Sequence, residues 1–144
     1  MKAGIFKDTG NGQIGQIAFV VSEGFNWPNG RVYDAASNEE IGYIALGSQD
    51  HTVVNIYKNT GEASSRAKLF GSGFIRDIVG SAVKPGLIFR GTTQVGHIDD
   101  DGKVYREGDN KVLGYVEGVR VGNEETNYMS LVLKGGAALV TLLS

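Results

Sequence analysis

Short apolar segments alternate with polar turns along most of the chain, and the pattern is clearest between residues 87 and 117. Four segments there are rich in β-branched or aromatic residues, which favour strands: Leu87–Arg90, Gln94–Ile98, Lys103–Arg106 and Lys111–Glu117. The Asp101-Gly102 pair between the second and third segments is typical of a tight hairpin turn. The pattern therefore predicts a four-stranded antiparallel meander.

The same order of residue types recurs along the chain as a degenerate internal repeat. Each copy has an apolar residue followed by an aromatic one, and later an apolar-Gly-x-apolar motif. The three full copies are Ile5-Phe6 with Ile14-Gly15 and Ile17, Val32-Tyr33 with Ile41-Gly42 and Ile44, and Val104-Tyr105 with Leu113-Gly114 and Val116. Partial copies begin at Ile56 and Ile88. Their uneven spacing argues against a solenoid and favours an all-β barrel, prism or small propeller-like arrangement of hairpin repeats.

The apolar-Gly-x-apolar motif predicts an irregularity in the strand. Its two apolar residues, such as Ile41 and Ile44, are three positions apart and would point to opposite faces of a straight strand. A β-bulge at the glycine would turn both toward one core; the alternative is a strand buried on both faces. We expect valine at Gly15, Gly42 or Gly114 to cost more than the ~1 kcal/mol span of strand propensity. The aromatic residues at equivalent positions belong in the core or on one shared face: Phe6, Tyr33, Tyr57 and Tyr105.

Two segments fit the repeat less well. Residues 62–82 are compatible with two helical turns or with a loop that leads into a strand, and we favour the loop and strand. The apolar tail, residues 131–143, is compatible with a membrane anchor or a buried strand. Lys134 and the pair Gly135-Gly136 leave a run much shorter than the ~20 apolar residues of a membrane span. The tail is therefore predicted to be a buried C-terminal strand in a single all-β domain over residues 1–144.

Several of these motifs together resemble small uncharacterised bacterial β-repeat proteins. The likeness rests on aromatic strand starts such as Val32-Tyr33-Asp34, apolar-Gly-x-apolar closes such as Ile41 to Ile44, and the tail Gly135 to Leu139. The resemblance implies an all-β fold, and it carries no activity and no functional residues.

Composition and charge narrow the functional classes. The net charge is −2 and the basic residues are scattered singly, so the chain lacks the basic patch that binds a nucleic-acid backbone. It contains no cysteine, which removes thiolate nucleophiles and thiolate metal sites. Lys7-Asp8 interrupts the N-terminal apolar residues before they reach the length of a signal-peptide core, so the cytoplasm is the default compartment.

The candidate chemistry is sparse. Asp99 and Asp101 suggest a calcium ligand pair, but the positions that follow do not match an EF-hand loop, and we favour a solvated hairpin turn, which needs the Asp-Gly pair in any case. No serine lies in a Gly-x-Ser-x-Gly elbow, and neither Gly-x-Gly loop is followed by the Lys-Ser/Thr of a phosphate site. We therefore predict no catalytic residue and no cofactor.

The strongest functional signal is aromatic. Phe25 and Trp27 precede the turn Pro28-Asn29-Gly30. We favour Trp27 as a cap on one end of the core; the alternative is an aromatic face beside amides that would stack on a sugar or anchor a protein. The sequence favours a non-enzymatic structural or binding module. The alternative is a carbohydrate-active hydrolase with paired carboxylates. The partner classes left open are a second copy of the chain, another protein and a glycan.

Overall fold

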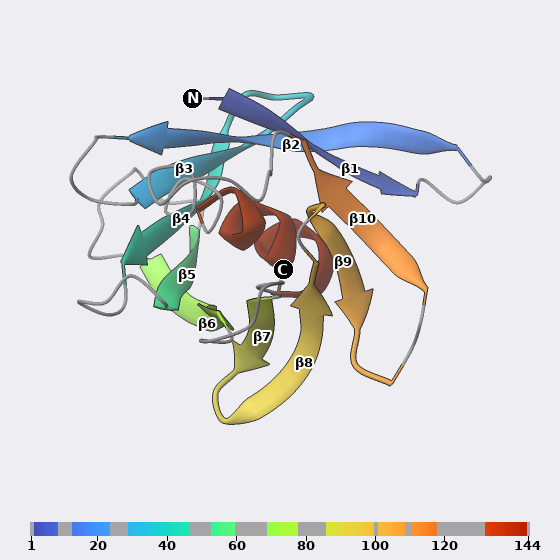
Figure 1. Cartoon of the computed structure of the whole chain (residues 1–144). Helices are drawn as coiled ribbons and strands as arrows, with labels where there is room; N and C mark the ends of the chain where they lie inside the picture. The colour runs from blue at the N-terminus through green and yellow to red at the C-terminus, as the bar shows by residue number, and fades with distance from the viewer. Residues whose placement is uncertain are drawn as a thin grey trace.

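Ten antiparallel strands close into a barrel in the computed structural model, which describes residues 2–8, 13–23, 29–46, 53–59, 69–77, 86–99, 101–108, 111–117 and 132–143 (Figure 1). The strands are β1 (Lys2–Asp8), β2 (Ile14–Glu23), β3 (Asn29–Asp34), β4 (Glu40–Leu46), β5 (Val53–Asn59), β6 (Leu69–Asp77), β7 (Gly86–Arg90), β8 (Thr93–Ile98), β9 (Lys103–Arg106) and β10 (Val112–Val116). Each strand pairs with its neighbours in the sequence, and β1 pairs with β10. The all-β prediction and its barrel alternative are confirmed.

The seam between β1 and β10 closes the sheet. Ile5 lies opposite Val116, Phe6 opposite Tyr115 and Lys7 opposite Gly114. Because the ring of described strands is complete, none of them leaves a free edge to which another strand could be added.

The predicted meander and the predicted strand after residue 62 are both present, as β7 to β10 and as β6. Three turns contain glycines with the positive φ that turns of this kind require: Gly91 (62°), Gly102 (85°) and Gly108 (79°).

The same register shift occurs in all five hairpins. The second strand of each hairpin has one extra residue opposite an apolar-aromatic pair of the first strand; these extra residues are Ile17, Ile41, Ser72, Val95 and Leu113. Ile17, Ile41 and Val95 pack against the core. A bulge therefore does turn both apolar residues of the motif toward one core. The extra residue in the strand, however, is the one before the glycine and not the glycine itself.

The first hairpin corrects the sequence alignment. Its bulge lies at Ile17, and Ala18 occupies the place that glycine has in the other hairpins. Ile14 and Gly15 lie further toward the turn, and Ile14 is 61% exposed. The Ile14-Gly15 pair was misaligned because it matches the motif, whereas the residue that pairs with Ile5 is an alanine, which only the strand pairing reveals.

The inner wall of the barrel alternates large and small residues. In the first strand of each hairpin a fully buried β-branched residue directly precedes the aromatic residue and points inward: Ile5, Val32, Ile56, Ile88 and Val104. The residue paired with each of them is small: Ala18, Gly42, Gly73, Gly96 and Gly114. The small residues leave space along the axis of the barrel.

A C-terminal helix fills that space, which corrects the predicted strand. Residues 132–138 are α-helical and continue as the π-helical segment η2 (Leu139–Leu143); we call residues 132–143 the central helix, drawn in red in the middle of the barrel (Figure 1). The tail is buried as expected. It is a helix because a closed barrel offers no strand edge, so the backbone N–H and C=O groups of an enclosed segment must bond within it.

Large residues of the central helix lie against small residues of the wall, and small against large. A side chain at Gly42 would collide with Leu139, one at Gly96 with Leu142, and one at Gly30 with Val132. Conversely, Gly135 lies against Ile44, and Gly136 against Val20 and Ile5. This interlocking sets both the depth and the rotation of the helix.

The ends of the central helix follow the barrel axis. Val132 lies at the start of β3, whereas Leu142 lies near the β7–β8 turn, where Arg90 Nη2 donates to the Leu142 carbonyl at 3.0 Å. A cation on these last carbonyls is favourable because the C-terminal end of a helix is partially negative.

Lys134 is the one charged residue among the described residues of the core. No helix in the described part of the chain is long and apolar enough to cross a lipid bilayer.

Candidate functional site

Aromatic residues recur on the outer face of the barrel wherever two hairpins meet. The strand register pairs Phe19 with Tyr33, Tyr43 with Tyr57, Phe74 with Phe89, His97 with Tyr105 and Tyr115 with Phe6. Apart from Phe74, whose side chain lies outside the described ones, these residues have inward residues of the core as sequence neighbours, so these nine positions face outward. We call the nine positions the aromatic belt. Phe6, Tyr33, Tyr57 and Tyr105 thus share one face, and it is the outer face.

Among the described side chains, three pairs of the belt have stacked rings. The centroids are 5.0 Å apart for Phe6 and Tyr115, 5.2 Å for Phe19 and Tyr33, and 4.8 Å for His97 and Tyr105, with interplanar angles of 11°, 21° and 11°. Lys2 Nζ also lies 4.1 Å from the centroid of Phe19. Such pairs contribute about 0.5–1.5 kcal/mol each, so the belt both fastens adjacent hairpins and presents aromatic surface.

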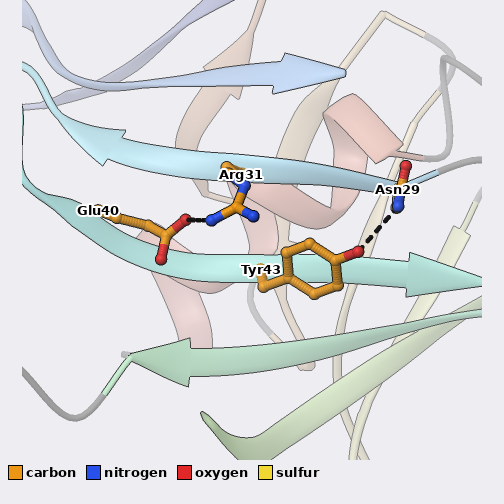
Figure 2. A network of polar contacts seen from close by, with 4 residues as sticks. All are labelled: Asn29, Arg31, Glu40 and Tyr43. Atoms are coloured by element: carbon orange, nitrogen blue, oxygen red, sulfur yellow. Dashed lines mark hydrogen bonds and ion pairs between the residues drawn. The ribbon is translucent and has the colours of Figure 1, made fainter. Parts of the chain in front are cut away.

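Polar side chains surround one section of the belt, on β3 and β4 (Figure 2). Arg31 Nη1 forms an ion pair with Glu40 Oε1 at 2.6 Å, and Asn29 Nδ2 donates to Tyr43 Oη at 2.8 Å. The Arg31 guanidinium lies 5.8 Å from the Tyr43 ring centroid. We call Asn29, Arg31, Glu40 and Tyr43 the polar network.

The polar network is ordered and only partly open to solvent. Tyr43 is 6% exposed, and the side chains of Arg31 and Glu40 are 30% and 14% exposed. A guanidinium held by a carboxylate loses little further conformational freedom when it contacts a ligand. An amide, a guanidinium and a carboxylate beside aromatic rings provide the planar donors and acceptors that bind hydroxyl or peptide groups.

The sequence-predicted binding residues lie outside the described residues. Phe25 and Trp27 precede Asn29 by four and two positions. The sequence did not indicate Arg31, Glu40 or Tyr43. The alternation of inward and outward residues around Val32 could have indicated Arg31, because it places Arg31 and Tyr33 on the outer face. It could not have indicated Glu40 or Tyr43, because the bulge at Ile41 changes which residues of β4 lie beside β3.

The candidate metal residues lie in the β8–β9 turn. Asp99 Oδ1 accepts from the backbone N–H groups of Asp101 (3.0 Å) and Lys103 (2.9 Å), and Tyr105 Oη donates to Asp99 Oδ2 at 3.3 Å. Asp99 therefore shapes the turn, as the hairpin interpretation requires. Asp101 is exposed. Within the described residues no three His, Cys, Asp or Glu side chains gather in a way that could hold a metal ion.

The Asp99 carboxylate also affects Tyr105. Partial burial raises the pKa of the Tyr105 phenol above its usual value of 10.0, and the charge of Asp99 and its hydrogen bond raise it further. The neutral phenol is thus favoured in the folded state. Its contribution to stability is fully present below pH 10 and is lost as the pH rises through the folded pKa.

We expect Asp99→Asn to lower the pKa of Tyr105 toward 10, because the substitution removes the negative charge and leaves the burial. The measurement is an ultraviolet absorbance titration of phenolate, with Tyr105→Phe identifying the contribution of this residue. An unchanged Tyr105 titration in Asp99→Asn would contradict the contact.

The described residues thus form an aromatic outer belt and one polar network. No protein-family model, curated protein or solved structure matches the chain, so comparison with known proteins adds no precedent for either feature.

Proposed function

We propose that this protein is a non-enzymatic binding module, a barrel of five related β-hairpin repeats that contacts its ligand through the outer face of β3 and β4. The observation that carries the proposal is that the chain's own helix fills the barrel. Many small barrels bind ligands inside, and here the residues that would line such a cavity are the buried core. Recognition is therefore assigned to the outer face.

Three acidic residues already have ion-pair or hydrogen-bond partners within the protein, which favours a binding function over hydrolysis. Glu40 is paired with Arg31, Asp34 Oδ1 accepts from the backbone N–H groups of Ala36 and Ser37, and Glu107 accepts from Gln94. Each of these carboxylates has a partner that explains its position. A glycosidase needs two carboxyl groups facing one bond, with one of them protonated.

The polar network and the aromatic belt together favour a glycan as the ligand class. Sugar rings stack on aromatic faces, and their hydroxyls take the hydrogen bonds that arginine, asparagine and carboxylates offer. We include Trp27 in the proposed site because it lies two residues before Asn29 in the sequence.

We expect a member of a soluble glycan panel to raise the melting temperature of the purified protein, because a ligand that binds only the folded state stabilises it by mass action. Arg31→Ala and Trp27→Ala should each lose the shift, and Thr92→Ala, in the exposed β7–β8 turn, should keep it. Release of reducing sugar during the incubation would identify the hydrolase instead. A shift that survives both Arg31→Ala and Trp27→Ala would place the ligand elsewhere.

A further inference from the structure

One charged position recurs in the hairpin repeats, directly after the aromatic residue of each first strand. Four of the five hairpins have a cation there and the fifth has an aspartate: Lys7, Lys58, Arg90, Arg106 and Asp34. The next position holds a different residue in each hairpin: Asp8, Asn59, Gly91, Glu107 and Ala35. Lysine is depleted in strands, so strand preference does not explain the cations. The repeat therefore retains a charge as well as the residues that build the core.

The strand register turns these cations toward the inside of the barrel. Residues that are paired across neighbouring strands project to the same face of the sheet. Three of the cations are each paired with a glycine that faces the central helix: Lys7 with Gly114, Lys58 with Gly42 and Arg106 with Gly96. The Arg90 side chain reaches the Leu142 carbonyl directly. The four cations thus surround the C-terminal end of the central helix, and we call them the basic arc.

The basic arc covers most of the circumference of the barrel. Its members lie on β1, β5, β7 and β9, so neighbours are two strands, about 10 Å, apart everywhere except across β3. Lys58, Arg90 and Arg106 are exposed, and Lys7 is half-buried. Within the described part of the chain, the side chains of Lys7, Lys58 and Arg106 have no ion-pair or hydrogen-bond partner.

The end of the central helix balances only part of this charge. The last carbonyls of a helix together act as about half of one negative charge. Arg90 already donates to one of these carbonyls. Three full positive charges remain around the same end of the barrel, so the arc has a surplus that a helix cap does not explain.

The described acidic residues at this end are directed away from the arc. Asp34 and Glu39 belong to the β3–β4 hairpin, where the arc has its gap, and Asp34 Oδ1 accepts from two backbone N–H groups of its own turn. Glu107 accepts from Gln94 on the outer face. Asp8 directly follows the inward cation of β1, so alternation directs it to the outer face.

We propose that the basic arc binds a compact multivalent anion, a small molecule with several phosphate or carboxylate groups, at this end of the barrel. Lysine and arginine hold the oxygens of both groups through charge-assisted hydrogen bonds. Because the cations are about 10 Å apart around one centre, each contacts a separate anionic group of the same ligand. A monovalent anion would contact one cation only and would gain little from the arc.

Isothermal titration calorimetry with tripolyphosphate, and separately with citrate, tests the proposal at low ionic strength. At least one of the two anions should bind, and sodium chloride should weaken the binding because salt screens exposed charges. Lys58→Gln and Arg106→Gln should each weaken it by about two- to fivefold, the range of one exposed ion pair. Arg90 is left unaltered because it also caps the helix.

Lys103→Gln is the matched control. It removes the same charge from the other end of β9, where Lys103 is exposed and paired with Tyr115 of the outer face, so it should bind the anion like the unaltered protein. Melting curves verify that each variant is folded; Lys58 and Arg106 are exposed, so neither substitution disturbs the core.

The proposal is overturned if neither anion binds, or if both arc variants bind as the unaltered protein does. An equal loss in Lys103→Gln would also overturn it, because overall charge would then explain the binding. Binding of tripolyphosphate alone assigns the arc to phosphate groups, and binding of citrate alone assigns it to carboxylates. None of these variants alters β3 or β4, so the basic arc and the glycan site succeed or fail separately.

Discussion

Removing residues 132–144 is expected to abolish cooperative unfolding. The central helix contributes five large buried side chains: Val132, Leu133, Leu139, Val140 and Leu143. At ~2 kcal/mol each, their burial contributes about 10 kcal/mol, which is comparable to the whole stability of a domain of this size. The deletion also exposes the inward side chains of the wall, such as Ile5 and Ile56, to the emptied interior.

The truncated chain should show a broad, non-cooperative denaturant transition and should bind a hydrophobic dye at neutral pH. Near-ultraviolet circular dichroism and denaturant melts measure both properties. The control is a chain that lacks only Ser144, which lies beyond the central helix and should melt like the full-length protein. A truncated barrel that unfolds in one sharp transition at the wild-type midpoint would show that the helix is dispensable.

Gly96→Ala is expected to destabilise the protein by about 3 kcal/mol, which corresponds to a fall in melting temperature of about 10 °C. A Cβ at this position would collide with the backbone carbonyl oxygen of Tyr105 on β9 and with Cδ1 of Leu142 in the central helix. A strand carbonyl cannot move aside without disturbing the ladder, so the cost exceeds that of an ordinary strand substitution.

Gly4→Ala is the matched control. Gly4 lies in β1 on the outer face, and its Cβ would meet only side-chain ends, Phe6 Cε2 at 2.9 Å and Gln16 Nε2 at 3.2 Å. These side chains can rotate, so we expect a change below ~1 kcal/mol in chemical denaturation. Equal losses in Gly4→Ala and Gly96→Ala would mean that the inward position has no special steric role.

A double-mutant cycle examines the helix contact itself. A Cβ at Gly42 would meet Leu139 and the carbonyl of Tyr57, 2.8 Å away. Leu139→Ala removes the first obstacle and leaves the second, so Gly42→Ala should cost less in the Leu139→Ala background than alone. Additive effects would indicate that the two residues are not in contact.

Most of the strands could be predicted because their signals are local. Alternation, β-branched residues and glycine turns act over a few residues, and they located β7 to β10 within one or two positions. The recurring motif aligned Val32, Ile56 and Val104, and each of these three residues is fully buried. The first hairpin was misaligned because its small inward residue is Ala18, where the other hairpins have glycine.

The candidate site was less accessible to prediction. Aromatic residues such as Tyr33 and Tyr57 were recognised as equivalent, but the partners with which they align belong to neighbouring hairpins. Arg31 and Glu40 are ordinary charged residues in the sequence, and their ion pair depends on the bulge at Ile41 that offsets β4 against β3. A register of this kind is a property of paired strands, and a single strand does not contain it.

The sequence by itself determined the strands, the turns and the burial of the tail, because backbone preference and hydrophobicity act over neighbouring residues. Tertiary structure decided that the sheet closes and that the tail is helical. An apolar run such as Ala137-Ala138-Leu139 is compatible with either a buried strand or a buried helix. The closed barrel excludes the strand, since its interior has no unpaired edge, and the glycines on its wall leave the space into which the helix fits.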